Sequence, residues 1–148
     1  MNLDELYKQM ILEHNKHPRN FKDVDPCTHY SHGKNPLCGD EFKVMLRLQS
    51  NCVEEIGFLG VGCAISKASG SMMTDALKGK TVEECLALKD QFLDLVTQDK
   101  EVDSSLGKLK VFEGVKQFPV RVKCAALVWR ALEDALEQGS EEHSISTE

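Results

Sequence analysis

The order of the hydrophobic periodicities along the chain constrains its fold more than any other feature. Apolar and polar residues alternate from Phe42 to Leu48, which predicts a half-buried strand. A turn at Ser50-Asn51 leads into a second apolar stretch, 53–58, which predicts an antiparallel partner. Beyond it the apolar spacing becomes helical. At least two strands followed by a run of helices predict an α+β domain, a small antiparallel sheet with helices packed on one face.

Amphipathic spacing predicts four helices, at 3–14, 65–76, 81–96 and from about residue 121 or 122 to 137. The segments 20–41 and 97–108 are rich in turn or polar residues, and we expect both to be irregular. His14, at the end of the first helix, is expected on the surface. We predict a single domain over residues 1–139, with 140–148 as a disordered acidic tail.

Length and charge exclude several classes of protein. The 148 residues suit one domain, and the net charge of −6 opposes general nucleic-acid binding, which requires cations to displace counterions. The N-terminal stretch lacks the apolar core of an export signal, and the longest apolar run, Cys124–Trp129, is too short to cross a membrane. We therefore expect a cytoplasmic protein with reduced thiols and neither nucleic-acid nor membrane partners.

Three of the six cysteines lie where predicted elements begin or end. Cys38 precedes the first strand, Cys63 lies at a strand-to-helix junction, and Cys124 is expected in the first turn of the last helix. A helix N-terminus lowers thiol pKa values, so we predict reactive thiolates at Cys63 and Cys124. Asp40 can turn its carboxylate to the same side of an extended segment as Cys38.

Three thiolates and a carboxylate would form a four-ligand site suited to Zn²⁺, or to iron in a cluster. Scattered cysteines are more often small buried apolar residues, and the chain has no Cys-x-x-Cys pair. The residues alone leave both interpretations open.

The other three cysteines receive no ligand role. Cys85 lies on the apolar stripe of a predicted helix and is expected in the core, whereas Cys52 merely follows a turn. Cys27 lies near His29 and His32 in a segment expected to be irregular, without a fourth ligand.

Three ordered motifs carry a resemblance to a known family. They are N-P-x-C-G-D at 35–40, G-x-G-C-x-I-S at 60–66 and F-P-x-R-x-K-C-A at 118–125. Together with the N-terminal H-x-x-x-P-R-N stretch, they resemble the IscU/SufU (NifU N-terminal-like) iron–sulfur cluster assembly proteins. The resemblance covers about residues 3–136 and implies the SufE/IscU-like fold.

The chain resembles the SufU branch more closely than the IscU branch. Lys123 stands where IscU-type proteins have a histidine, the stretch between Cys63 and Cys124 is long, and Arg121 fits the SufU pattern. The IscU chaperone-binding motif is replaced by 118–121.

The resemblance implies that Cys38, Asp40, Cys63 and Cys124 bind Zn²⁺. It implies a sulfurtransferase-like protein that accepts persulfide sulfur from a SufS-like cysteine desulfurase and passes it to downstream assembly or acceptor proteins. We expect Cys38 to be the acceptor, with Arg121 pairing with Asp40 when the site opens. The alternatives are a non-enzymatic scaffold holding a transient [2Fe–2S] cluster and a structural zinc adaptor.

Overall fold

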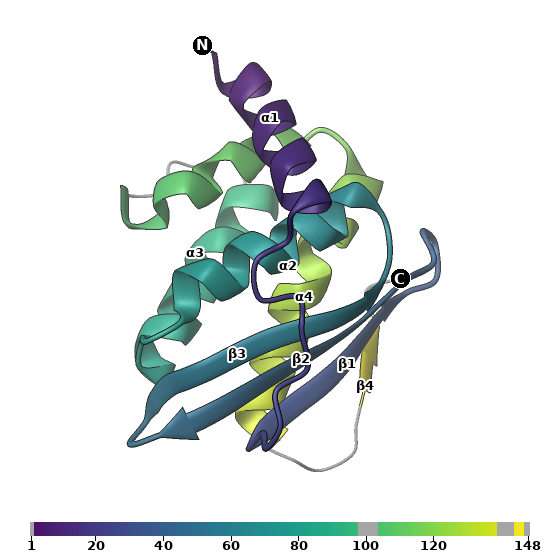
Figure 1. Cartoon of the computed structure of the whole chain (residues 1–148). Coiled ribbons are helices and arrows are strands. Elements are labelled where there is room, and N and C mark those ends of the chain that lie inside the picture. The colour runs from purple at the N-terminus through teal and green to yellow at the C-terminus, as the bar shows by residue number, and fades with distance from the viewer. Residues whose placement is uncertain (1, 98–103, 139–143, 147–148) are drawn as a thin grey trace.

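A computed structural model of the protein describes residues 2–97, 104–138 and 144–146. Its strands form one sheet in the order β3-β2-β1-β4 (Figure 1). The strands are β1 (His29–Asn35), β2 (Asp40–Gln49), β3 (Cys52–Val61) and β4 (Ser144–Ser146). The first three pair in antiparallel register, and β4 runs parallel to β1.

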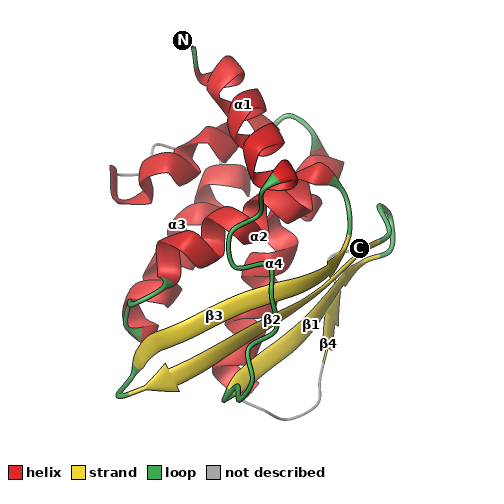
Figure 2. Cartoon of the chain, in the orientation of Figure 1, coloured by secondary structure: helices red, strands yellow, loops and turns green. Residues whose placement is uncertain are grey.

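The helices pack on one face of this sheet, as Figure 2 shows. They are α1 (Leu3–Lys16), α2 (Ala64–Leu77), α3 (Val82–Thr97), the 3-10 segment η1 (Ser104–Val115) and α4 (Pro119–Gln138). The predicted α+β architecture is therefore confirmed. Side chains cap two of these helices: Asn2 accepts a hydrogen bond from the Glu5 N–H at the start of α1, and Thr81 exchanges hydrogen bonds with Glu84 at the start of α3.

Strand β1 lies in the segment that we expected to be irregular, so that prediction is wrong. Its inward positions are small or polar: Ser31, Gly33 and Asn35 are buried against α4 and carry no apolar signal. A Cβ atom at Gly33 would lie 3.0 Å from the Leu127 side chain. Helix α4 can therefore approach β1 closely only because these side chains are small.

Two further boundaries differ from the predictions. The expected 97–108 loop is helical from Ser104 onward, and residues 98–103 lie outside the described parts of the chain. Helix α4 begins at Pro119, a residue suited to the first helical position, and not at residue 121 or 122. Cys124 is therefore in the second turn of α4, which changes its electrostatic setting.

The core lies between the sheet and the helices. Trp129 stacks on Phe92 with ring centroids 4.5 Å apart, and Met73 and Cys85 are fully buried. The core assignment of Cys85 is therefore confirmed. The surface assignment of His14 is wrong, since this side chain is 6% exposed and its Nδ1 lies 2.6 Å from the Ser71 hydroxyl.

Within the predicted tail, residues 144–146 form β4 and the other residues lie outside the described ranges. In the described part of the chain, no helix combines the length and apolar character that crossing a membrane requires.

Candidate metal centre

Four elements meet at one end of the sheet and bring the candidate ligands together. Cys38 lies in the turn that joins β1 to β2, and Asp40 is the first residue of β2. Cys63 is the N-cap of α2, and Cys124 projects from the second turn of α4. Asp40 and Cys124 are each 2% exposed, whereas Cys38 and Cys63 are half-buried. The site thus has a buried floor and an accessible rim.

The distances define a compact donor cluster. The ligand atoms of Cys38, Asp40 and Cys124 all lie within 4.8 Å of one another, and the Cys38 and Cys124 Sγ atoms are 3.2 Å apart. Cys63 joins the cluster from the α2 side, with its Sγ 3.8 Å from Asp40 Oδ2. The structure therefore brings together all four residues that the sequence singled out.

Ser66 ties these residues to one another. Its hydroxyl lies 2.5 Å from Asp40 Oδ2, 3.1 Å from the Cys124 carbonyl oxygen and 3.5 Å from Cys63 Sγ. The Ser66 backbone N–H donates to the same sulfur, as expected at a helix N-cap. The Cys63 N–H in turn donates to Asp40 Oδ1 at 2.8 Å. These hydrogen bonds therefore join the start of α2 to the start of β2.

The three thiols differ in their readiness to ionise. Hydrogen bonds from the Cys124 thiol and from Ser66 outweigh burial and lower the pKa of Cys63 to about 6. The pKa of Cys124 is raised, because its thiol proton bonds to Cys63 and the side chain is buried. The prediction of a reactive thiolate is supported for Cys63. For Cys124 it is wrong, because the second turn of α4 lacks the free N–H groups of a helix N-terminus.

Asn35, the last residue of β1, completes the buried floor. Its amide nitrogen donates to Cys124 Sγ at 3.7 Å, which favours negative charge on that sulfur. Its Oδ1 is buried and has no hydrogen-bond partner among the described residues. Sequence reasoning quoted Asn35 and Ser66 within motifs but gave neither a role, because their contacts depend on tertiary structure.

The donor set fits a thiophilic metal ion. Soft thiolates combined with one harder carboxylate are typical of zinc or iron centres, not of calcium or magnesium sites. The neighbouring hydrogen bonds orient the donors, as outer contacts do at metal sites generally. Cys38, Asp40, Cys63 and Cys124 are therefore chemically suited to hold such an ion.

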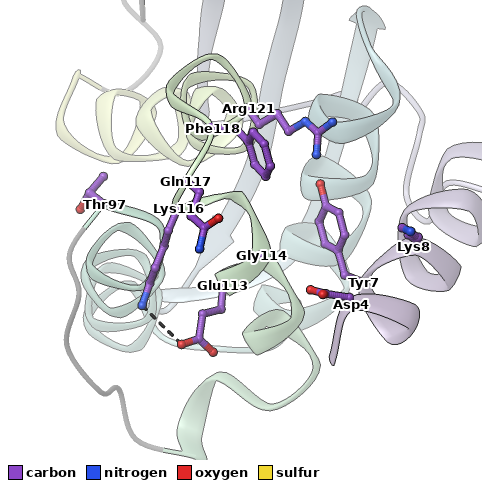
Figure 3. Close-up of a pocket in the computed structure, with 10 residues that line it drawn as sticks. All are labelled: Asp4, Tyr7, Lys8, Thr97, Glu113, Gly114, Lys116, Gln117, Phe118 and Arg121. Atoms are coloured by element: carbon purple, nitrogen blue, oxygen red, sulfur yellow. Dashed lines mark hydrogen bonds and ion pairs between the residues drawn. The ribbon is translucent and has the colours of Figure 1, made fainter. Parts of the chain in front are cut away.

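A cavity of about 760 Å³ lies between α1, η1 and the start of α4 (Figure 3). Arg121 lines it, with its guanidinium 4.4 Å from the centre of the Phe118 ring and near Tyr7. Burial raises the pKa of Tyr7; Arg121 opposes this shift, and charge on Cys63 and Cys124 adds to it. Arg121 therefore shares the electrostatic environment of the thiols, although no ion pair joins it to Asp40 in the described structure.

The remaining cysteines lie elsewhere. Burial raises the pKa of Cys85 to about 11, which keeps this core thiol neutral. Cys52 forms an isolated bridge with Thr81 at the start of β3. Among the described residues, Cys27 belongs to no group of three or more close donors.

Comparisons with known proteins find relatives that span most of this chain. A family model described as the NifU-like N-terminal domain matches residues 6–138. The zinc-dependent sulfurtransferase SufU of Bacillus subtilis is 46% identical over 134 residues, spanning 89% of this chain and 90% of that protein. The iron–sulfur cluster assembly scaffold protein IscU of Streptococcus pyogenes is 38% identical, spanning 93% of this chain and 87% of that protein.

A solved structure agrees with these sequence matches. A crystal structure described as an iron–sulfur cluster assembly scaffold for the SUF system of Fervidobacterium islandicum superimposes with a TM-score of 0.83. It is 33% identical and spans 89% of this chain and 97% of that chain. The architecture seen here is therefore shared over nearly the full length.

Proposed function

The chain belongs to the family of NifU-like N-terminal domains, and from this premise we propose that it works in iron–sulfur cluster assembly as an acceptor of persulfide sulfur. The observation that carries the proposal is the convergence of three thiols and one carboxylate. One of these thiols, Cys38, lies on a half-exposed turn that a partner enzyme can reach. The sulfur donor is a cysteine desulfurase, of the SufS type if the chain follows the SufU branch.

We propose that Cys38, Asp40, Cys63 and Cys124 hold Zn²⁺. The ion would keep the thiolates deprotonated and shield them from oxidation. The similarity to a zinc-dependent sulfurtransferase supports zinc as the resident ion. Asp40 is held by the Cys63 N–H and the Ser66 hydroxyl, so both of its oxygens stay oriented toward the site.

The transfer step is a thiolate–persulfide exchange. The Cys38 thiolate attacks the outer sulfur of the desulfurase persulfide, one S–S bond forms while another breaks, and the desulfurase cysteine leaves as a thiolate. Cys38 suits this task because it lies on a turn, whereas Cys124 is buried and Cys63 is held at the N-cap of α2. Arg121 is exposed at the rim and is the proposed counter-charge for Asp40 when the site opens.

Exposed apolar side chains beside the motifs offer a face for the desulfurase. Leu37 adjoins Cys38, Val61 precedes Cys63 by two residues, and Phe118 and Val120 precede Cys124 at the start of α4. Large apolar side chains that gather around an accessible site are typical of protein–protein contact. Docking there would bring the desulfurase persulfide toward Cys38.

The deciding experiment mixes the purified protein, its metal content known, with a desulfurase in substoichiometric amount and free cysteine. We expect desulfurase turnover to rise and sulfur to appear on wild-type protein, but neither on Cys38→Ser. Cys27→Ser and Cys52→Ser, which change half-buried cysteines away from the site, are the matched controls. The proposal fails if Cys38→Ser stimulates turnover and carries sulfur like the wild type.

A second candidate function is a scaffold on which a [2Fe–2S] cluster is assembled and then passed to acceptor proteins. The 38% identical IscU scaffold of Streptococcus pyogenes supports it, because the same donors could hold a cluster. The same mixture separates the two functions. A stable cluster formed only after iron is added, without stimulation of the desulfurase, would favour the scaffold.

A further inference from the structure

The two sulfur atoms of Cys38 and Cys124 are close enough to react with each other. Their separation of 3.2 Å must shorten by only about 1 Å to reach the S–S bond length of a disulfide. We propose that Cys124 resolves the persulfide on Cys38, releasing sulfide and leaving a Cys38–Cys124 disulfide. This inference rests on the proposed function, because it takes Cys38 as the residue that receives the sulfur.

Cys124 is placed to react with Cys38 and with little else. It is 2% exposed and projects from α4, so a persulfide on another protein cannot reach it directly. Cys63 is not placed in the same way, because its sulfur is held by the Ser66 N–H and hydroxyl at the N-cap of α2. Among the three thiols, Cys124 is therefore the one that lies in position to attack sulfur on Cys38.

The turn that carries Cys38 can make the required movement. Gly39 has a φ of +71°, and among the described residues beyond its chain neighbours no atom lies within 4 Å of where its Cβ would be, so the turn has free space beside it. The neighbouring Leu37 is 62% exposed, and the Cys38 N–H donates to the Asn35 carbonyl oxygen at 3.2 Å. Cys124 is fixed on a core helix, so Cys38 is the residue that must move to bring the two sulfur atoms together.

The step balances without any added oxidant. Cys124 Sγ attacks the inner sulfur of the Cys38 persulfide, the new S–S bond forms, and the outer sulfur leaves as hydrosulfide. The Cys124 sulfur is oxidised, the departing sulfur is reduced, and the thiol proton leaves with it as hydrogen sulfide. The Asn35 amide nitrogen, which donates to Cys124 Sγ, stabilises the thiolate form in which this sulfur attacks.

The product differs chemically from a stored persulfide. Sulfur leaves the site as sulfide, and the disulfide takes two thiols out of the proposed metal site. A dithiol reductant must then supply two electrons to restore both thiols. Release of sulfide would in this way be coupled to opening of the metal site.

The test loads the protein with sulfur and follows its mass. Wild-type and Cys124→Ser protein are incubated with a desulfurase and cysteine, quenched in acid without reductant, and analysed by intact-mass spectrometry and sulfide assay. We expect the wild type to release about one sulfide per chain and to lose about two mass units, with a Cys38–Cys124 peptide that dithiothreitol cleaves. Cys124→Ser should keep a persulfide, a gain of about 32 mass units, and release no sulfide.

Two variants serve as controls. Cys52→Ser changes a half-buried thiol away from the site and should still form the disulfide. Cys124→Ala repeats the test without a buried hydroxyl, and circular dichroism checks the fold of each variant.

The inference is overturned if wild-type protein retains the added sulfur and releases no sulfide, including the case in which the sulfur moves onto Cys124. Failure of the proposed function looks different, because then no variant gains sulfur from the desulfurase. In that event, loading with inorganic polysulfide tests the resolving step alone, with the same mass changes as the criterion.

Discussion

Ser66 and Ser69 lie one turn apart on α2 and are both buried, but their hydroxyl groups contact different parts of the molecule. The Ser66 hydroxyl faces Asp40, Cys63 and the Cys124 carbonyl. The Ser69 hydroxyl donates to the Ala125 carbonyl oxygen and accepts from the Trp129 indole N–H. On α2, Ser66 therefore contacts the candidate metal centre, whereas Ser69, one turn later, contacts the core.

This difference predicts how each serine affects Cys63. Ser66→Ala removes a hydrogen bond to the thiolate, so the pKa of Cys63 should rise from about 6 by roughly one unit. The pH dependence of iodoacetamide alkylation in chelator-treated protein measures this shift. Ser69→Ala should instead destabilise the fold by about 1–3 kcal/mol and leave the alkylation midpoint unchanged. Equal midpoints in wild type and Ser66→Ala would contradict the assigned role.

The sign of the linked stability follows from the same shift. Because folding lowers the pKa of Cys63, its thiolate stabilises the metal-free protein fully above the ordinary thiol pKa of about 9. That contribution declines as the pH falls toward 6 and is absent below it.

Gly62 sets how closely α2 approaches the sheet. A Cβ at this position would lie 2.7 Å from Asp40 Oδ1 and 2.7 Å from the Phe42 ring. Gly62→Ala must therefore displace a ligand or a core ring, and we expect a loss of about 1–3 kcal/mol of stability together with weaker Zn²⁺ binding. Gly114→Ala is the control, since its Cβ would meet only ordinary contacts with Tyr7. Unchanged zinc affinity in Gly62→Ala, measured by competition with a chromophoric chelator, would count against this reasoning.

At the scale of elements, α3 and α4 are joined by a charged contact. The Lys89 side chain is 8% exposed and forms an ion pair with Glu133 of α4, and its ammonium lies 2.7 Å from Asp90 Oδ1. Because the Lys89 ammonium group is buried, these carboxylates stabilise its charge in place of water.

Loss of the Lys89–Glu133 contact should lower stability without changing the candidate metal centre. Lys89→Ala leaves Glu133 without its nearest cation, and we expect about 1–3 kcal/mol of destabilisation in urea denaturation. Arg130→Ala removes a more exposed pair with the same glutamate, 3.9 Å long, and should cost less than about 0.5 kcal/mol. Similar losses of stability in both variants would show that burial does not determine how much an ion pair with Glu133 contributes.

The elements also show what sequence patterns can and cannot predict. Strands β2 and β3 and helices α2 and α3 were predictable because their apolar side chains repeat with the period of the element. Strand β1 was not, because it buries Ser31, Gly33 and Asn35, which periodicity analysis treats as polar or neutral. The four candidate ligands were recognisable from their motifs, but their distances and the contacts of Ser66 arise only when four elements meet.

At the scale of the whole molecule, the candidate metal centre and the core are largely separate. The stacked Phe92 and Trp129 rings and the T-shaped contact of Phe92 with Phe112 lie among α3, η1 and α4. The donor cluster lies where β1, β2, α2 and α4 converge at one end of the sheet. We therefore expect a domain with such an extensive apolar core to fold without a metal ion, unlike small zinc-dependent modules.

This separation predicts the result of removing the metal. After treatment with a strong chelator, the far-UV circular dichroism spectrum should stay that of an α+β protein, because the core contributes most of the folding free energy. The melting temperature should fall by about 5–10 °C, as expected for loss of a ligand present at about 100 times its dissociation constant. Chelated Cys38→Ser should melt close to the chelated wild type, since its half-buried sulfur then has no metal to hold. Complete unfolding on chelation would instead identify a structural zinc domain, and the exchangeable site that sulfur transfer requires would have to be abandoned.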